Sequence, residues 1–192
     1  MDSSESSLFN EIKIPLARSE VESMTPYSAP LEGRRNLLRL DFNENTIGPS
    51  PKVLERIQSI RSEQISIYPE YNGLTKALAD NLNTSNTSNP LNSNQIGIFN
   101  GVDAAIHSIF YAYGDKKEKF LTTVPTFGYY KPCASMQGME TIEIPYIGSN
   151  FEFPFHEIKE ALIELKPKIF IICNPNNPTG TNLSAEKVIE LA

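Results

Sequence analysis

From residue 95 onward, short apolar runs alternate with stretches in which apolar residues recur every three or four positions. The short runs are typical of β-strands and the periodic stretches of α-helices. The predicted strands are Gln95–Phe99, Lys119–Val124, Thr141–Pro145 and Lys168–Cys173. The predicted helices are Val102–Tyr113, Phe127–Gln137, Phe155–Leu165 and a last helix that Ser184 caps. Strands and helices that alternate at this spacing predict an α/β fold with a mainly parallel sheet.

The first 94 residues lack this alternation. Residues 1–11 are rich in Ser and Glu, and we expect them to be disordered. Residues 12–50 contain three prolines before Gly48 and little periodicity, so residues 1–50 are predicted to form an extended N-terminal arm. Helices are predicted after Ser50, where Pro51 suits a first helical turn, and from about Asn72. The polar tract that follows, residues 83–94, is expected to be a surface loop.

Residues 51–192 are predicted to form one large domain that is incomplete at its C-terminus. The last apolar run, KIFIIC at residues 168–173, is the kind of strand that other elements cover on both faces. No strand follows it, and only eight residues follow the cap Ser184. We therefore interpret the chain as interrupted inside a domain.

Charge and composition narrow the classes of function. The 192 residues carry a net charge of −6. Such a balance lacks the basic footprint of a nucleic-acid-binding protein, and no stretch reaches the roughly 18 apolar residues of a membrane span. The N-terminus has no basic region followed by an apolar core, so a cytoplasmic location is expected. The two histidines, His107 and His156, lack metal-ligand spacing, and no metal site is expected.

The motif with the clearest chemistry is CNPNNPTG, residues 173–180, directly after the last apolar run. In open α/β sheets, ligands bind at the carboxyl ends of the strands. Pro175 and Pro178 restrict the backbone, and Gly180 permits a sharp exit, so Asn177 can present its amide from a rigid loop. The alternative is an ordinary turn, because Asn, Pro and Gly dominate turns. The length of the motif and its place after a strand favour a binding site.

Further motifs occur in a fixed order along residues 20–190. They are MTPY (24–27), DFNEN with GPSP (41–45 and 48–51), YPE (68–70), NGVD (100–103) and PTFGYY (125–130). Together with CNPNNPTG, this ordered set resembles the fold-type I pyridoxal-phosphate (PLP) aminotransferases, and within them the histidinol-phosphate aminotransferase branch. The resemblance implies the N-terminal portion of such an enzyme, with a PLP-binding large domain of fold type I.

The resemblance also implies which residues bind the cofactor. Asn177 would donate a hydrogen bond to the phenolic oxygen of PLP and so help the ring act as an electron sink. Phe127 would stack on the pyridine ring, although an ordinary core aromatic at a helix start remains open. The backbone N–H groups of Val102 and Asp103 would bind the phosphate at a helix N-terminus. The residue after this aspartate is usually acidic in the family, whereas this chain has Ala104.

Three further residues follow from the resemblance. Tyr68 would reach across a homodimer interface to the partner's PLP phosphate. Its alternative reading is an extended Tyr-Pro dipeptide. Tyr27 and Asn45 would line the pocket of a small-molecule substrate. Asn45 and its neighbour Glu44 suit equally well a turn before Gly48.

No catalytic residue is assigned. In the resembled family, the lysine that binds PLP as a Schiff base follows NPTG by many tens of residues, and here only Lys187 follows Gly180. The implied reaction is amino transfer between histidinol phosphate and 2-oxoglutarate, in histidine biosynthesis. Three alternatives stay open: a truncated non-catalytic fragment, a half-enzyme completed by a separate chain, and a related aromatic aminotransferase or a threonine-phosphate decarboxylase-like enzyme.

Overall fold

The computed structural model describes residues 15–25, 32–83 and 88–192. Contacts divide the chain into two compact units, each of which is described by itself. Among the described residues, the sheet unit contains residues 15–25 and 100–192, and the helical unit contains residues 32–83 and 88–99. The sequence analysis placed a boundary after residue 50. Its division into an N-terminal arm of residues 1–50 and a large domain of residues 51–192 stays a prediction.

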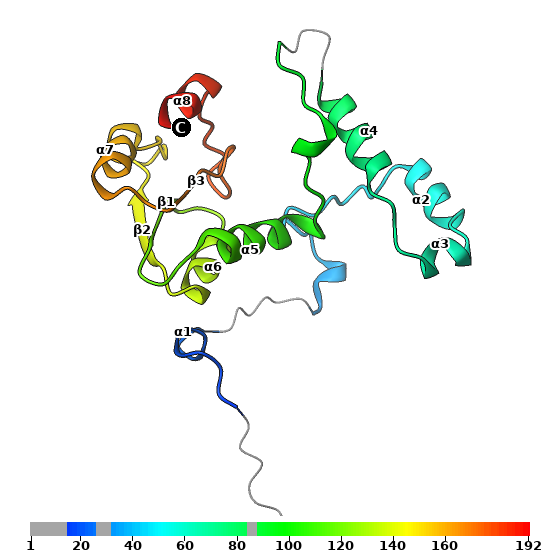
Figure 1. Cartoon of the computed structure of the whole chain (residues 1–192), viewed down its shortest axis with the longest axis horizontal. Helices are drawn as coiled ribbons and strands as arrows, with labels where there is room; N and C mark the ends of the chain where they lie inside the picture. The colour runs from blue at the N-terminus through cyan, green and yellow to red at the C-terminus, as the bar shows by residue number, and fades with distance from the viewer. Residues whose placement is uncertain (1–14, 26–31, 84–87) are drawn as a thin grey trace, which may run out of the picture. The chain divides into compact units, whose positions relative to one another are not determined.

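The sheet unit is built on three parallel strands in the order β2–β1–β3 (Figure 1). The strands are β1 (Lys119–Val124), β2 (Glu140–Pro145) and β3 (Ile169–Ile171). Phe120 in the central strand pairs with Thr141 on one side and with Ile169 on the other. The predicted α/β fold with a parallel sheet is confirmed, and β3 is shorter than the predicted run of residues 168–173.

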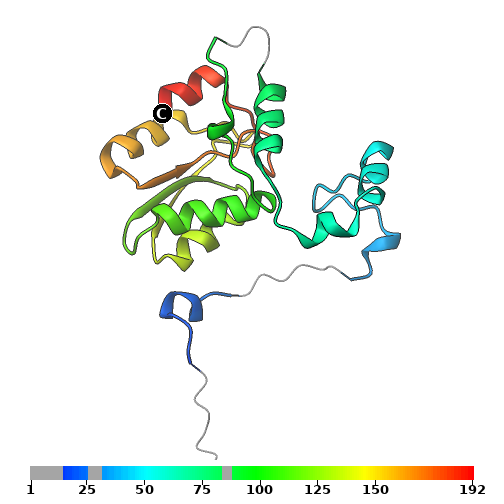
Figure 2. The same ribbon diagram turned by 45° about the vertical axis from the view of Figure 1, so that its right-hand side comes forward.

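Helices cover both faces of this sheet, as Figures 1 and 2 show. They are α5 (Gly101–Tyr113), α6 (Tyr130–Met136), α7 (Phe155–Leu165) and α8 (Ala185–Leu191). Consecutive strand residues point to opposite faces, so the fully buried Phe120 and Leu121 enter different cores. Phe120 packs with Phe110 of α5 and Cys133 of α6, whereas Leu121 packs with Ile158 of α7 and with apolar residues of α8. The result is a three-layer arrangement with the sheet in the middle.

The short helix α1 (Ser19–Glu22) belongs to the sheet unit and contacts α6. The guanidinium of Arg18 donates a hydrogen bond to the carbonyl oxygen of Met136 at the end of α6. The carboxylate of Glu20 forms an ion pair with Lys116, in the loop between α5 and β1. These two contacts attach a segment far away in sequence to the sheet unit.

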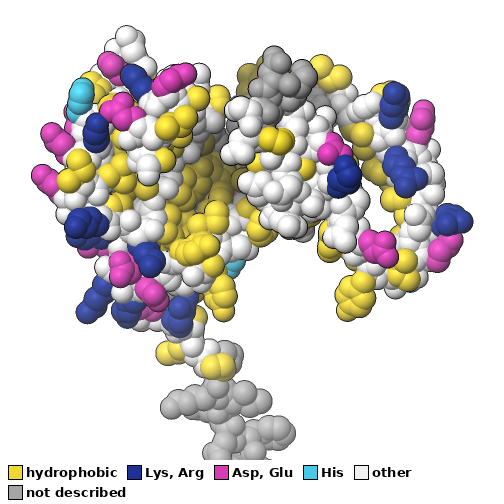
Figure 3. All heavy atoms as spheres, turned by 45° about the horizontal axis from the view of Figure 1, so that its top comes forward, with side chains coloured by type: hydrophobic (Ala, Val, Ile, Leu, Met, Phe, Trp, Pro, Cys, Tyr) yellow, Lys and Arg dark blue, Asp and Glu magenta, His cyan; other side chains and the backbone are white. Residues whose placement is uncertain are grey.

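The described residues of the helical unit form three helices and two short 3₁₀ turns. They are α2 (Pro51–Gln58), α3 (Ser62–Ser66), α4 (Asn72–Leu82), η1 (Arg34–Asn36) and η2 (Ser93–Gln95). The predicted helices after Ser50 and from Asn72 are confirmed, although the Ser50 side chain makes no capping hydrogen bond. Apolar side chains of α2 and α4 remain exposed, and hydrophobic side chains are visible at the surface in Figure 3. Within the described ranges, no helix has the length and apolar character needed to cross a membrane.

Two local predictions are wrong. The segment Gln95–Phe99 is not a strand: Gln95 ends η2, and residues 96–99 have no regular structure. A strand needs a hydrogen-bonded neighbour, and this segment has no strand partner in the described chain. The helix expected from Phe127 begins instead at Tyr130, because residues 125 and 126 are held in a loop by hydrogen bonds to Asn176.

Candidate functional site

Two loops leave neighbouring parallel strands at their carboxyl ends. The loop after β1 contains Pro125, Thr126 and Phe127, and the loop after β3 contains the CNPNNPTG motif. Since β1 and β3 are paired in parallel, both loops lie at the same edge of the sheet. The peptide bonds before Pro125, Pro175 and Pro178 are cis.

Asn176 joins the two loops. Its side chain is buried, with 3% of the residue exposed. The Nδ2 group donates hydrogen bonds to the carbonyl oxygen of Pro125 (3.0 Å) and to Oγ1 of Thr179 (2.8 Å), and Oδ1 accepts one from the hydroxyl of Thr126 (2.9 Å). Its backbone is held as well, since its N–H donates to the carbonyl oxygen of Thr181 (2.8 Å). The loop after β3 is therefore fastened both within itself and to the loop after β1.

Asn177 differs from its neighbour because its side chain is half-buried. Its backbone N–H donates to the Sγ atom of Cys173 at 3.4 Å. In the part of the chain that the structure describes, its side-chain amide has no hydrogen-bond partner. The loop thus holds the backbone of Asn177 and leaves two N–H donors of its side chain available to a ligand.

Phe127 directly follows Thr126, whose hydroxyl bonds to Asn176 of this loop. Its ring is half-buried and meets the Tyr130 ring edge-on, with the ring centres 5.5 Å apart. Burial raises the pKa of Tyr130 well above its usual value, and the Cys173 thiol beside the hydroxyl contributes further. Phe127, Tyr130 and Cys173 thus form a series of neighbours that leads from the loop after β1 to Asn177.

Among the described residues, the first turn of α5 offers backbone N–H donors that the N-cap side chain does not use. Gly101 has a φ of +81°, and the side chain of Asn100 makes no capping hydrogen bond to the helix. Val102 is 66% exposed and Asp103 is exposed as well. A Cβ atom at Gly101 would meet no atom within 4 Å, so the space beside this turn is open. Uncapped N–H groups at the start of a 13-residue helix are suited to bind an anion.

Electrostatics connect this turn to α6. Burial raises the pKa of Cys133, and the charge of Asp103 raises it further. Tyr129 responds in the same way: burial is the main cause of its raised pKa, and Asp103 contributes. Helices α5 and α6 also pack in one core together with Phe127, so α5 lies on the same face of the sheet as Phe127. Val102, Asp103, Phe127 and Asn177 all belong to the sheet unit.

Two of the other predicted residues lie outside the sheet unit. Tyr68 and Asn45 belong to the helical unit, and Tyr68 is 98% exposed. The side chain of Asn45 is part of a turn, because its Nδ2 donates to the Gly48 carbonyl (3.0 Å) and its Oδ1 accepts from the Ile47 N–H (3.1 Å). Tyr27 lies outside the described residues. The roles expected of these three residues stay predictions.

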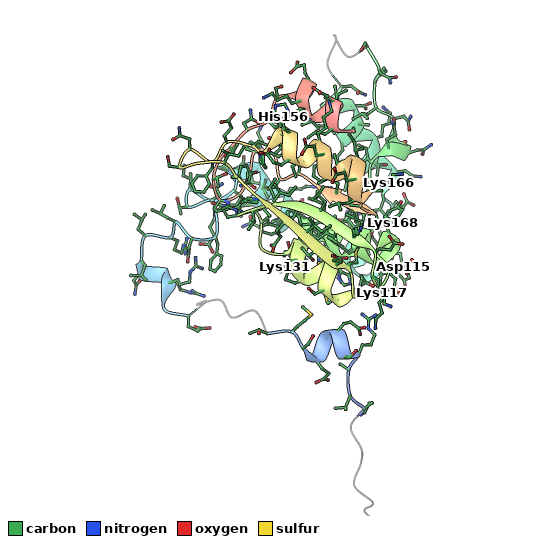
Figure 4. The ribbon with its side chains drawn as sticks, turned by 90° about the vertical axis from the view of Figure 1, so that its left-hand side faces the viewer. Asp115, Lys117, Lys131, His156, Lys166 and Lys168 are labelled. Carbon is green, nitrogen blue, oxygen red and sulfur yellow. The ribbon has the colours of Figure 1, made fainter. Side chains whose placement is uncertain are left out.

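Two other surfaces contain none of the predicted residues. An open depression of about 740 Å³ is lined by Ile147, Phe151, His156, Thr181 and Lys187, among others. Phe127, Asn177 and the first turn of α5 do not line it. The end of the sheet at which the strands begin carries Asp115, Lys117, Lys166 and Lys168 (Figure 4). Within the sheet unit, neither of these two surfaces contains Val102, Asp103, Phe127 or Asn177.

The sequence interpretation missed Asn176, Thr126 and Thr179. All three lie inside the motifs PTFGYY and CNPNNPTG, but no feature of the neighbouring sequence distinguishes Asn176 from Asn177. One sequence feature could have identified them: the polar residues Thr126 and Asn176 each follow shortly after an apolar strand. Side chains after adjacent parallel strands can meet, and this pattern could have indicated a contact between the loops.

The groups at this edge fit PLP. A phosphate matches the uncapped first turn of α5, an aromatic ring matches Phe127, and a phenolic oxygen matches the available amide of Asn177. Each fits one chemical feature of the cofactor.

Solved structures share this fold. The histidinol-phosphate aminotransferase of Sinorhizobium meliloti, in complex with pyridoxal-5′-phosphate, matches with a TM-score of 0.76 and 22% identity, over 91% of this chain and 46% of that chain. A putative histidinol-phosphate aminotransferase of Erwinia carotovora atroseptica matches with a TM-score of 0.71 and 24% identity, over 86% and 46%. At these identities the similarity establishes the fold, which is fold type I.

Curated relatives are closer in sequence. A dihydroxyacetone phosphate transaminase of Campylobacter jejuni is 32% identical over 91% of this chain and 48% of its own length. A histidinol-phosphate aminotransferase of Clostridium novyi is 30% identical over 92% and 48%. The chain thus spans about half the length of the curated relatives it matches.

The model of the family described as aminotransferase class I and II matches residues 35–192. This range includes both loops at the carboxyl edge and the first turn of α5. The chain therefore belongs to the class I and II aminotransferases, a family that depends on pyridoxal 5′-phosphate.

Proposed function

We propose that this chain forms the part of an aminotransferase that binds the phosphate and one ring face of PLP. We further propose that the enzyme transfers an amino group between histidinol phosphate and 2-oxoglutarate, in histidine biosynthesis. The observation that carries the proposal is the arrangement of Asn177. Its available amide lies on a loop that Asn176 joins to the loop of Phe127, in the same unit as the first turn of α5. Relatives with the name histidinol-phosphate aminotransferase support the choice of substrate.

Each group of the chain has a distinct task in this proposal. The N–H groups of Val102 and Asp103 bind the phosphate and fix the position of the cofactor. Phe127 covers one ring face and excludes water from it. The Asn177 amide donates a hydrogen bond to the phenolic oxygen and stabilises its ionised form. The bound cofactor supplies an electron sink for the electron pair released at the substrate carbon.

Amino transfer also needs a lysine to move a proton. Lys187 does not meet this need, because it lies on α8 and its Nζ atom is 5.6 Å from the centre of the Phe155 ring. Phe155 packs in the core that contains Leu121, on the opposite face of the sheet from α5 and Phe127. We propose that the lysine comes from polypeptide that corresponds to the other half of the relatives, either in the same gene product or in a separate chain.

A second candidate substrate has support of its own. The relative with 32% identity is a dihydroxyacetone phosphate transaminase. The substrate in its name and the substrate in the name of the histidinol-phosphate aminotransferases are both phosphate esters of a small alcohol. The two candidates are distinguished by assay, with histidinol phosphate as amino donor in one reaction and dihydroxyacetone phosphate as amino acceptor in the other.

Binding is the first test. Pyridoxine 5′-phosphate has the ring, the phenol and the phosphate of the cofactor but no aldehyde, so surface lysines do not react with it. The 192-residue chain is expected to bind it saturably, and Asn177→Ala is expected to weaken binding about fivefold to tenfold. Asn182→Ala, an exposed asparagine in the same connection before α8, is the matched control and should bind as wild type. Absence of saturable binding, or equal losses in both variants, would contradict the proposal.

Activity is the second test. The chain is co-expressed with a polypeptide that covers the other half of the curated relatives, and glutamate formation from histidinol phosphate and 2-oxoglutarate is followed. Activity that needs both polypeptides supports the half-enzyme. Amination of dihydroxyacetone phosphate with glutamate as amino donor, without any reaction of histidinol phosphate, would replace the substrate. No activity with either substrate would favour a non-catalytic fragment.

We also propose that the active form is a homodimer in which Tyr68 contacts the cofactor phosphate of the partner. The exposure of Tyr68 leaves its hydroxyl available for such a contact. Tyr68→Phe removes the hydroxyl and keeps the ring, so it should weaken phosphate binding without changing the mass of the complex in light scattering. A monomeric active enzyme would overturn this assignment.

A further inference from the structure

We propose that Asn176 is a positioning residue that makes the Asn177 loop and the Phe127 loop a single rigid support for the cofactor ring. This inference rests on the proposed function. Asn176 is buried, and its side chain spans from the loop after β3 to the loop after β1. It therefore acts on the ring through its neighbours and not by contact.

The hydrogen-bonding capacity of Asn176 explains why it does not bind the cofactor itself. A side-chain amide has two N–H donors. In Asn176 these donors go to the Pro125 carbonyl and to the Thr179 hydroxyl, while the oxygen accepts from Thr126. Asn177, the next residue, uses only its backbone N–H within the described residues. Of these two consecutive asparagines, Asn176 therefore fastens the loop and Asn177 offers a hydrogen-bond donor.

The position of these bonds suggests more than a general structural role. Thr126 directly precedes Phe127, and Asn176 directly precedes Asn177. The hydrogen bond between the Thr126 hydroxyl and Asn176 therefore joins the backbones that carry the proposed stacking residue and the proposed amide donor. If that bond is lost, the amide and the ring of Phe127 are free to shift relative to each other. The ionised phenol should then be less well stabilised, although neither contacting residue has changed.

The test uses the 192-residue chain and pyridoxine 5′-phosphate, with Thr126→Val and Thr126→Ser as the matched pair. Val removes the hydroxyl at similar volume, whereas Ser keeps it. Absorbance of the bound probe is followed against pH, because it reports the ionisation of the phenol. Thr126→Val should raise the phenol pKa towards the value of the free probe and weaken binding about threefold to tenfold. Thr126→Ser should restore both properties.

A second threonine controls for loss of stability. Thr123 is fully buried on β1, and its hydroxyl bonds to the Tyr146 hydroxyl at 3.3 Å, away from the Asn176 contacts. Thr123→Val should leave the phenol pKa unchanged, whatever its effect on thermal unfolding. Asn176→Ala, if it folds, should change the phenol pKa at least as much as Thr126→Val. Hydrogen exchange at the Gly180 N–H, which donates to the Asn176 carbonyl at 2.7 Å, reports loosening of the loop without any ligand.

The outcomes separate this inference from the proposed function. If the wild type binds the probe and Asn177→Ala raises the phenol pKa, but Thr126→Val and Asn176→Ala do not, the positioning role is overturned and the proposed function stands. If Thr123→Val shifts the phenol pKa as much as Thr126→Val, the effect is one of general stability and the inference fails. If the wild type does not bind the probe, the proposed function fails and the inference fails with it.

Discussion

The hydroxyl of Thr126 donates a 2.9 Å hydrogen bond to the side-chain oxygen of Asn176, which lies 50 residues further along the chain. This bond joins the loops that follow two neighbouring parallel strands, β1 and β3. Because each loop contains one predicted ring contact, Phe127 or Asn177, their relative position depends on a contact between residues that do not themselves bind the ring.

Asn177→Ala is expected to affect catalysis more than cofactor retention. In an active assembly the amide acts mainly on the ionised phenol, whereas the phosphate and the ring face contribute most of the binding. We expect kcat to fall on the order of a hundredfold, and the PLP dissociation constant to rise less than tenfold. Steady-state kinetics and equilibrium dialysis measure the two quantities. Equal losses in both would argue against the electron-sink role.

Gly101→Ala is expected to destabilise α5. With a φ of +81°, an alanine at this position is strained even though its Cβ would meet no atom, and the cost is about 1 kcal/mol. Gly73→Ala is the matched control, because Gly73 lies inside α4 without a positive φ and its Cβ would also meet no atom. That change should stabilise α4 by about 0.5–1 kcal/mol. Hydrogen exchange in each helix measures both effects, and the same sign in both would contradict the backbone argument.

Phe110→Ala is expected to destabilise the sheet unit strongly. Phe110 is fully buried and meets Phe120 edge-on, with the ring centres 4.9 Å apart. Its removal leaves a cavity between α5 and the sheet and should cost about 3–5 kcal/mol of unfolding free energy. Tyr111→Ala, at a position that is 76% exposed, should change the stability by less than about 0.5 kcal/mol. Urea unfolding, followed by circular dichroism, measures the unfolding free energy of both variants. Similar losses of unfolding free energy would contradict the place of Phe110 in the core.

Attachment of α1 is expected to depend on pH. The hydrogen bond from Lys116 is the main cause that lowers the pKa of Glu20 from its ordinary 4.5 to about 2. Since the folded pKa lies below the unfolded one, the ion pair contributes its full stabilisation above pH 4.5, and that contribution is lost as the pH falls towards 2.

NMR titration of the Glu20 carboxyl carbon checks this expectation, with the α1 amide signals as a second reporter. Lys116→Met keeps much of the side-chain length and removes the charge, so the pKa of Glu20 should return towards its ordinary value. High salt should act in the same direction, because both partners are near the surface. A carboxyl that titrates normally in the wild type would show that the pair does not hold α1.

The local pattern of apolar and polar residues was sufficient to predict several helices and strands. β1 and α7 have the predicted bounds, Lys119–Val124 and Phe155–Leu165, because apolar runs and helical periodicity are local properties of the chain. Ser184 caps α8 through its side chain as predicted. The segment Gln95–Phe99 has an equally suitable composition, but a strand exists only with a partner, and the described chain offers none. The start of α6 was likewise misplaced, because distant contacts hold Pro125 and Thr126.

By itself, the sequence determined the alternation of strands and helices, the place of CNPNNPTG after the last strand, and the ordered motifs that indicate the family. These features depend on the period of the pattern and on the identity of neighbouring residues. The tertiary structure alone decided which asparagine is buried and which is available, and on which face of the sheet Lys187 lies. Those outcomes depend on hydrogen bonds and packing between residues far apart in sequence, such as Thr126 and Asn176, which no local pattern encodes.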